Sequence, residues 1–363
     1  MPAWPDTITG PPSGFFMLPT SRRRGRPPRA FFVLLLVVAC ASGACVGGHA
    51  LTPSAFAPSA IAWLGPAVSS DGAALARWRA SVGPPVISHH EPRSAPADEV
   101  TLVSWNTALG AGDVRGMVRA LRARSQAPLV LLLQEVYRSG PEVPHVLDPG
   151  ASFARRLGAA DPTGRRDEIE TIAADLGLSV FYVPSMRNGG PQVSDEDRGN
   201  AILTDLPLTD LSAIELPFER QRRVAVAATI NGVAGDSPWS LRVVSAHLDN
   251  VTTGPKRVWF VGSEYARVRQ ARGLLGALKG DAPMVLGGDF NTWFGFSDLT
   301  YVETARAFPG TTVSDRRPTF RGLLRLDHLF FRLPPGWHAQ FSRGDSAYGS
   351  DHRPLIATIQ IRS

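Results

Sequence analysis

Short apolar runs separated by polar segments dominate the chain from residue 98 onward, a pattern typical of β-strands joined by loops and a few helices. We predict strands at 99–105, 128–133, 179–183, 200–203, 223–230, 241–247, 282–286, 325–331, 338–341 and 355–361. Helical spacing of apolar residues predicts helices at 114–124, 166–176 and 265–278. Gly177 and Gly280 follow the last two of these segments and favour helix ends there.

The order of these elements indicates the fold class. Strands outnumber helices, and helices come between pairs of strands. The segment 128–133 is almost entirely apolar, as in a strand that is buried on both faces. We therefore predict an α+β fold in which two β-sheets pack face to face and helices cover their outer faces.

The first 48 residues have the pattern of an export signal or a membrane anchor. Five arginines between positions 22 and 29 precede an apolar run at 30–41, and small residues follow. The run is shorter than the ~20 residues of an ordinary membrane span. Cleavage after Ala41 or Ala44 is one outcome. Lipid attachment to Cys40 is the other, since the four residues ending there are similar to a bacterial lipobox. We expect an extracytoplasmic protein, secreted or anchored in a membrane.

Composition then divides the chain into three parts. Residues 1–48 form the signal or anchor segment, and 49–97 are rich in Ala, Pro and Ser, which we interpret as a linker with one short helix at 73–82. Residues 98–363 form the folded domain.

Charge and cysteine content narrow the function classes. Residues 1–97 hold 8 basic and 3 acidic side chains, whereas 98–363 hold 30 and 29, so the predicted domain is nearly neutral. A basic nucleic-acid-binding surface cannot be inferred from such a balance, and a mixed solvated surface is the simpler interpretation. Both cysteines, Cys40 and Cys45, precede the domain. Thiol catalysis, disulfides and cysteine-based zinc sites are therefore excluded within it.

Candidate chemistry lies in seven short polar motifs at the ends of predicted strands. They are Ser104-Trp105-Asn106-Thr107, Leu133-Gln134-Glu135-Val136, Arg198-Gly199-Asn200-Ala201, Ser245-Ala246-His247-Leu248-Asp249-Asn250, Gly288-Asp289-Phe290-Asn291-Thr292, Leu326-Asp327-His328 and Ser350-Asp351-His352-Arg353-Pro354. Such carboxylates, amides and imidazoles are unusual in a hydrophobic core and suit one hard cation and one phosphate ester. Since all the motifs adjoin strand ends, they can converge at one edge of the sandwich.

Glu135 and Asn106 are candidate metal ligands. Glu135 follows a buried strand directly, and a carboxylate there is costly unless it is paired or metal-bound. Asn106 follows another apolar strand and offers a neutral oxygen. A hard cation such as Mg²⁺ prefers these oxygen ligands. The structural alternatives are a turn cap for Asn106 and a salt bridge for Glu135.

Asp289 and Asn291 form a candidate pair for holding water. On an extended segment, side chains at i and i+2 face the same side, so the Asp can accept a proton from a water that the Asn orients. His247 ends a strand, with Asn250 three residues later. As a cation, His247 can stabilise charge that grows on a phosphoryl oxygen.

Asp327 and His352 form our preferred dyad, because a carboxylate distant in sequence commonly orients a catalytic histidine. His328 points to the opposite face by the two-residue period of a strand and is left out. The sequence has no Gly-x-Ser-x-Gly elbow, no His-Glu-x-x-His motif, no P-loop and no dinucleotide fingerprint.

The ordered motifs over 98–363 resemble the endonuclease/exonuclease/phosphatase superfamily, which includes pancreatic-type DNase. The resemblance implies a DNase-I-like, four-layered α/β sandwich and cleavage of phosphate esters with Mg²⁺, or with Mn²⁺. It implies that Asn106 and Glu135 contact metal and phosphate, that Asp351 is a further metal-side carboxylate, and that Asp289 and Asn291 position the attacking water. It also implies that His247 contacts phosphate beside Asn250, that Asp327 supports His352 in stabilising the phosphoryl group or moving a proton, and that Asn200 lies near the substrate.

Two motifs differ from those of subfamilies within this superfamily, and each difference bears on which substrate we expect. Gln134-Glu135-Val136-Tyr137 differs from the Gln-Glu-Thr-Lys of abasic-site nucleases. Arg325-Leu326-Asp327-His328 replaces the Pro-x-x-Cys-Asp-Arg-type motif of inositol-polyphosphate phosphatases. The near-neutral domain also disfavours a long duplex, whose binding depends on phosphate neutralisation.

We expect a monomeric phosphodiesterase that acts on extracellular nucleic acid or a phospholipid head group, with no protein partner. A phosphomonoesterase and a catalytically silent binding module are the alternatives. The binding module would have lost a ligand or dyad residue, and none is missing here.

Overall fold

The computed structural model describes residues 60–65, 69–91, 97–144, 166–187, 196–250 and 259–361, and the strands within these ranges form two mixed β-sheets. In sheet order, the six-stranded sheet contains β1 (Ala62–Leu64), β7 (Leu208–Glu215), β8 (Val224–Ala234), β9 (Ser237–His247), β10 (Met284–Asp289) and β11 (Asp327–Arg332). The seven-stranded sheet contains β12 (His338–Arg343), β13 (Leu355–Gln360), β3 (Glu99–Asn106), β4 (Leu129–Ser139), β6 (Glu196–Thr204), β5 (Ser179–Arg187) and β2 (Val86–Ser88).

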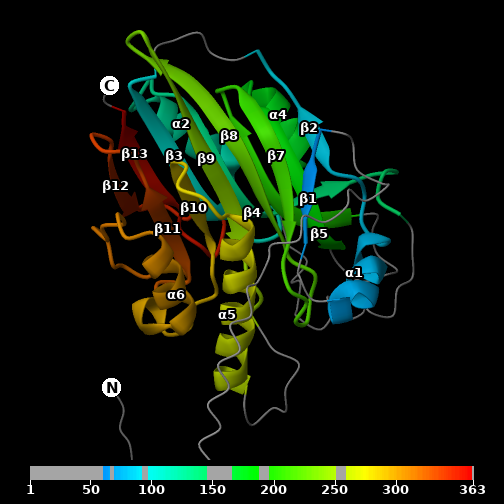
Figure 1. The fold of residues 1–363 in the computed structure, drawn as a ribbon. Coiled ribbons are helices and arrows are strands. Elements are labelled where there is room, and N and C mark those ends of the chain that lie inside the picture. Colours follow the sequence, from blue (N-terminus) through cyan, green and yellow to red (C-terminus); the bar gives the residue numbers. More distant parts are fainter. Residues whose placement is uncertain are drawn as a thin grey trace, which may run out of the picture. The chain divides into compact units, whose positions relative to one another are not determined.

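Helices flank the two sheets (Figure 1). They are α1 (Gly72–Arg79), α2 (Val114–Arg122), α4 (Ile169–Leu176), α5 (Trp259–Ala277) and α6 (Leu299–Ala307), with short 3₁₀ turns at Ser69–Asp71 and Gly295–Ser297. Helices α2 and α4 pack on the seven-stranded sheet, where Met117 and Ile172 join its outer hydrophobic cluster. From α5, Leu274 joins the cluster on the outer face of the six-stranded sheet.

The principal hydrophobic core lies between the sheets. Leu132 of β4 and Val243 of β9 are fully buried within it, together with Val285 of β10. Burial of apolar side chains between two facing sheets is the main stabilising contribution in such a sandwich. The predicted fold class, two packed mixed sheets with flanking helices, is therefore confirmed.

Residues assigned to a linker belong in part to this fold. β1 pairs in parallel with β7, and β2 pairs antiparallel with β5, so each extends one sheet at its edge. The linker prediction for 49–97 is therefore wrong for the described residues. Strands of three residues are too short to produce a clear alternation, which is why the sequence pattern did not reveal them. The predicted helix at 73–82 is present as α1. The signal or anchor prediction for 1–48, like residues 49–59, lies outside the described residues.

Two other elements, strand β7 and helix α6, were not predicted from the sequence. β7 carries exposed Thr209 and Asp210 at a point where its pairing with β8 shifts register, which interrupts the alternation expected of a strand. Helix α6 has a weakly apolar face, and its first turn is capped by the Asp298 carboxylate, which accepts the Thr300 N–H. Within the part of the chain that the structure describes, no helix is both long and apolar enough to span a membrane.

Hydrogen bonds also join the two sheets directly. Gln134 Nε2 on β4 donates to Ser245 Oγ on β9 at 2.9 Å, and that hydroxyl donates to the Leu133 carbonyl at 3.0 Å. Asn200 Nδ2 on β6 donates to the Val224 carbonyl of β8 at 2.7 Å. Buried polar groups need such partners, and each pair fixes the spacing of the two sheets near their polar end.

Candidate active site

One cavity of about 450 Å³ lies where the polar motifs meet. Eight of the ten predicted site residues line it, namely Asn106, Glu135, His247, Asn250, Asp289, Asn291, Asp351 and His352. Asp327 lies behind His352, and Asn200 is not among the lining residues. The structure therefore brings the set together, and the roles assigned to its members stay predictions.

Strand register places Asp289 at the centre of the site. Asp289 ends β10, opposite His247 of β9 on one side and Asp327 of β11 on the other. Gly288 makes this possible, because a Cβ there would lie 1.9 Å from the Ala246 carbonyl oxygen. Only glycine allows so close an approach of the two backbones.

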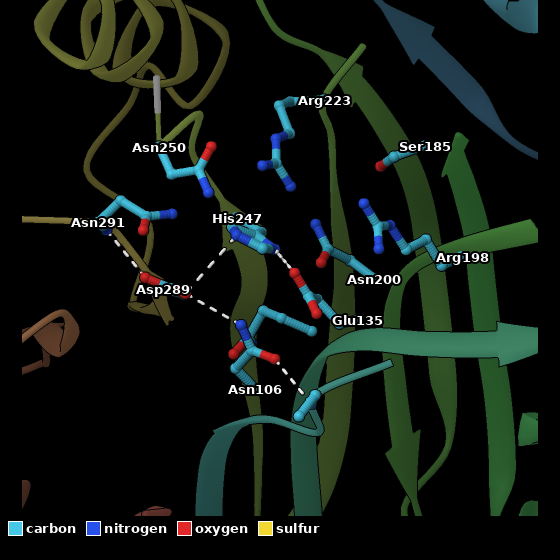
Figure 2. Close-up of polar contacts among 12 residues, drawn as sticks. Asn106, Glu135, Ser185, Arg198, Asn200, Arg223, His247, Asn250, Asp289 and Asn291 are labelled. Carbon is cyan, nitrogen blue, oxygen red and sulfur yellow. Dashed lines mark hydrogen bonds and ion pairs between the residues drawn. The ribbon is translucent and has the colours of Figure 1, made fainter. Parts of the chain in front are cut away.

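Asp289 is a buried carboxylate with several polar contacts (Figure 2). Its Oδ2 accepts the Asn106 Nδ2–H at 2.9 Å and lies 3.6 Å from His247 Nε2. Burial and the negative charge of Asp327 raise the pKa of Asp289 to about 7, although the His352 charge acts in the opposite direction. A carboxylate of this pKa can accept a proton efficiently near neutral pH.

Asn291 reaches the cavity by a different route from the one expected. Its φ is +50°, so the segment after β10 turns instead of continuing as a strand. Asp289 Oδ1 accepts the Asn291 N–H at 2.9 Å, and Asn291 Nδ2 donates to the Leu248 carbonyl at 3.0 Å. The prediction that both side chains share the face of an extended strand is wrong. A turn closed by the Asp289 carboxylate brings Asn291 to the same cavity.

The predicted dyad of Asp327 and His352 is present. His352 Nδ1 lies 2.8 Å from Asp327 Oδ2, and its Nε2 lies 3.7 Å from Asp289 Oδ2. Burial alone favours the neutral ring, but the Asp327 and Asp289 carboxylates outweigh it and raise the pKa of His352 to about 10. His352 is therefore a cation at neutral pH, suited to stabilising anionic oxygen. Asp327 is the first residue of β11.

Two neighbouring residues that sequence reasoning missed hold His352 in place. Ser350 Oγ donates to the Asn106 carbonyl at 2.7 Å and accepts the His352 N–H at 3.0 Å. Trp105 Nε1 donates to the His352 carbonyl at 3.0 Å. Both residues belong to motifs recognised in the sequence, but a positioning role leaves no pattern of its own.

His247 has a different charge state from the one expected. Its Nε2 faces Asp289, and its Nδ1 lies 3.8 Å from Glu135 Oε1. Burial of the ring, with the positive charges of Arg223 and Arg198, holds the pKa of His247 well below its usual value. The prediction of a cationic His247 is therefore wrong, and the neutral ring can act as a hydrogen-bond donor.

A backbone irregularity directs Glu135 into the cavity. β4 continues past it to Ser139, but the pairing with β6 shifts between Leu133 and Val136, and Glu135 has a φ of +53°. Such a bulge re-aims a side chain, and a positive φ at a non-glycine residue is characteristic of functional sites. The Glu135 carboxylate accepts no hydrogen bond from the described residues, where His247 Nδ1 lies 3.8 Å from its Oε1, so its oxygens are available to a ligand in the cavity.

The donor set suits a hard divalent cation near Glu135. Asn106 Oδ1 accepts the Ala108 N–H at 2.9 Å and keeps one lone pair. The Asp351 carboxylate lines the same cavity, 3.3 Å from Arg321 Nη2. Asp289, Asp327 and His352 also cluster, with ligand atoms within 4.8 Å of one another. A protonated His352 cannot ligate a metal, so the oxygen donors around Glu135 fit the cation better.

The two predicted substrate-binding residues differ in their surroundings. The Asn250 Oδ1 is buried at the cavity and has no hydrogen-bond partner among the described residues, so it can accept a hydrogen bond from a ligand. The Asn200 amide donates to the Val224 carbonyl between the sheets. This contact gives Asn200 a structural role and leaves its predicted role at the substrate without support from the geometry. His328, excluded beforehand, lies outside the lining set and contacts Thr292 Oγ1 at 2.7 Å.

Two buried arginines line the cavity and were not predicted as site residues. Arg198 immediately precedes Gly199-Asn200, and Arg223 precedes β8. The sequence did hold a signal for them, because each arginine lies within or beside a run that is otherwise apolar. A cation buried in such a run requires a partner or a ligand.

One curated protein is similar in sequence to part of this chain. A protein described as a probable DNA ligase from Anaeromyxobacter dehalogenans is 30% identical over 211 residues, which cover 47% of this chain and 40% of that protein. The chain thus spans less than half the length of this curated relative.

Several solved structures have a similar fold at low sequence identity. The human Nocturnin catalytic domain is 17% identical, with coverage of 73% of this chain and 96% of that chain and a TM-score of 0.46. Sphingomyelinase C from Streptomyces griseocarneus is 18% identical, with coverage of 72% and 99% and a TM-score of 0.44. An endonuclease/exonuclease/phosphatase from Beutenbergia cavernae is 19% identical, with coverage of 72% of each chain and a TM-score of 0.46.

A family model covers most of the cavity-forming region. It describes the Endonuclease/Exonuclease/phosphatase family and matches residues 103–352, a range that begins in β3 and ends at His352. With this match, the chain belongs to the endonuclease/exonuclease/phosphatase family, whose members hydrolyse phosphoric esters.

Proposed function

We propose that this protein is a Mg²⁺-dependent phosphodiesterase in which water attacks phosphorus in line. The observation that supports the proposal best is the arrangement around Asp289. This buried carboxylate, with a raised pKa, lies 3.7 Å from the cationic ring of His352 and shares a cavity with the available oxygens of Glu135. A proton acceptor, an oxyanion-stabilising cation and a metal-binding carboxylate are the parts that phosphoester hydrolysis needs.

The residues around the cavity have separate roles in the proposed reaction. Asp289 holds the attacking water and accepts its proton as the new P–O bond forms, while Asn291 keeps the carboxylate oriented through the hydrogen bond to Oδ1. The P–O bond opposite the water breaks, and the leaving alkoxide departs and takes a proton from solvent. His352, fixed by Asp327, donates from Nε2 toward the phosphoryl oxygens.

The cation site completes this arrangement. Enzymes of this family generally depend on a divalent metal, and a cation bound at Glu135, with Asn106 and Asp351 nearby, would supply Lewis-acid stabilisation of the developing negative charge. The proposed metal is Mg²⁺, because all three candidate ligands offer oxygen atoms.

Metal removal tests the proposal directly. We expect the full chain to hydrolyse at least one of bis(p-nitrophenyl) phosphate, plasmid DNA, sphingomyelin and p-nitrophenyl phosphate in the presence of Mg²⁺. Chelation should reduce the rate by at least about 10³-fold, since both charge stabilisation and substrate positioning are lost, and added Mg²⁺ should restore it. Hydrolysis that survives chelation would contradict the proposal, as would inactivity of the folded protein on every substrate. Preference for p-nitrophenyl phosphate would instead favour a phosphomonoesterase.

We also propose that the protein is exported, and either released or tethered through its N-terminal segment. The basic stretch, the apolar run at 30–41 and the small residues after it support this proposal. N-terminal sequencing and mass spectrometry of the mature protein should find a new terminus after Ala41 or Ala44, or a lipidated Cys40. Recovery of the unprocessed chain from the cytoplasm would contradict export.

A further inference from the structure

Two guanidinium groups belong to the cavity but have no part in the mechanism above. Arg198 lies on β6, and Arg223 immediately precedes β8. Both line the cavity, and at most about a tenth of either residue is exposed. Figure 2 shows their side chains near His247 and Glu135, on the side of the histidine away from Asp289.

Neither arginine has a close carboxylate partner among the described residues. Arg198 Nη2 contacts the Met186 sulfur at 3.4 Å, which is a weak acceptor, and its Nε has no partner. Arg223 Nη2 lies 3.8 Å from Asp249 Oδ1, and its Nε is also without a partner. The Asp249 carboxylate is already occupied, because it accepts backbone N–H groups from Arg220, Gln221 and Asn250.

Three other buried arginines have a much closer carboxylate partner, whereas Arg325 donates to the Arg317 carbonyl. Carboxylate oxygens lie 2.6 Å from Arg138, 2.6 Å from Arg222 and 2.9 Å from Arg267. A buried charge without a partner is costly, so the fold normally supplies one. Among the described residues, Arg198 and Arg223 have no carboxylate partner this close, and both side chains line the cavity.

The two cations also act on each other. Burial lowers the pKa of Arg198, and the positive charge of Arg223 lowers it further, while Glu135 partly compensates. Glu135 is also the proposed cation ligand. Two buried guanidinium groups that repel each other favour an anion between or beside them, and guanidinium geometry matches phosphate oxygens.

We propose that Arg198 and Arg223 bind a second anionic group of the substrate, a phosphate next to the scissile phosphodiester. This inference rests on the proposed phosphodiesterase activity and narrows its substrate class. The enzyme should prefer diesters that carry a neighbouring phosphate, whether in a nucleotide chain or in a phosphorylated lipid head group. A choline head group, which brings a positive charge to this part of the cavity, is disfavoured.

Paired substrates that differ by one phosphate test the inference in the unmodified protein. One pair is thymidylyl-thymidine with and without a 5′-phosphate, and the other is glycerophosphoinositol with and without a ring phosphate. In at least one pair, kcat/KM should be about 10- to 100-fold higher for the phosphorylated member, the effect of one or two charge-assisted hydrogen bonds. The pair that responds identifies the source of the second phosphate. Glycerophosphocholine should be hydrolysed more slowly than either preferred substrate.

Arginine variants then test whether Arg198 and Arg223 cause the preference for the phosphorylated substrate. Arg198→Met and Arg223→Met keep most of the side-chain volume and remove the charge, so the kcat/KM ratio within the responding pair should fall toward 1. Arg306→Met, at an exposed position in α6, serves as the matched control and should keep the ratio.

Three results would overturn the inference. The first is an equal kcat/KM for both members of each pair in the unmodified protein, a measurement that does not depend on the folding of any variant. The second is a fall in kcat/KM by the same factor for both members of the responding pair in the arginine variants. The third is absence of any hydrolysis, which also contradicts the phosphodiesterase proposal. Hydrolysis of bis(p-nitrophenyl) phosphate, measured alongside, distinguishes the first result from the third.

Discussion

Asp289→Asn is expected to lower kcat by about 10³-fold at neutral pH while leaving the fold intact. The amide keeps the shape of the carboxylate, and its oxygen can still accept the Asn291 N–H. It cannot accept a proton from water, because an amide is not basic at this pH. The measurement is kcat on the best substrate of the panel, with the melting temperature recorded for each protein.

Asp281→Asn is the matched control for this variant. Asp281 is exposed and precedes the same strand, β10, so the substitution makes the same chemical change outside the cavity. Its kcat should stay within about 2-fold of the unmodified value, since surface substitutions away from special features have small effects. Near-normal turnover by Asp289→Asn would exclude Asp289 as the proton acceptor.

Asp327→Asn is expected to reduce activity by about 10²-fold at pH 8 and to change the pH dependence. The Asp327 carboxylate makes the largest contribution to raising the pKa of His352. The useful form of His352 is protonated, and it persists below the pKa and disappears as the pH rises through it. The His352 limb of the profile should therefore lie near pH 10 in the unmodified protein and move to lower pH in the variant.

A double variant separates this role from general damage to the fold. If Asp327 acts through His352, then His352→Ala should already remove most of the benefit, and adding Asp327→Asn should cost little more. An unchanged alkaline limb in Asp327→Asn would contradict the dyad. Fully multiplicative losses in the double variant would indicate that the two residues act independently.

Much of the fold was predictable because it follows from local patterns. Long apolar strands such as 129–133, and helices that end at a glycine such as Gly177, have strong periodic signals. Edge strands β1 and β2 have only three residues each and owe their existence to pairing with β7 and β5. Their sequences alone do not distinguish them from a linker.

The candidate site was predictable in its membership more than in its geometry. Motifs at strand ends identified Asp289, Asn291 and His352, because strand ends converge in a sandwich. The left-handed conformation of Asn291 and the bulge at Glu135 depend on tertiary pairing, which a local pattern does not encode.

The charge states of buried groups and the hydrogen-bond partners of polar side chains could not be predicted from the sequence either. The neutral state of His247 results from its burial near two arginines that are 49 and 24 residues away in the chain. Asn200 appeared in a polar motif, yet its amide bridges the sheets through the Val224 carbonyl. Which partner a polar residue finds depends on distant strands that only the folded structure brings together.

The stereochemistry of hydrolysis tests direct attack by water most directly. A phosphorothioate diester analogue of the best substrate, chiral at phosphorus, would be hydrolysed in H₂¹⁸O with Mg²⁺. We predict inversion at phosphorus and incorporation of one ¹⁸O atom into the phosphorothioate product, because water held by Asp289 displaces the leaving group in a single in-line step. Retention of configuration would contradict this mechanism, since it requires two displacements and a covalent intermediate on the enzyme.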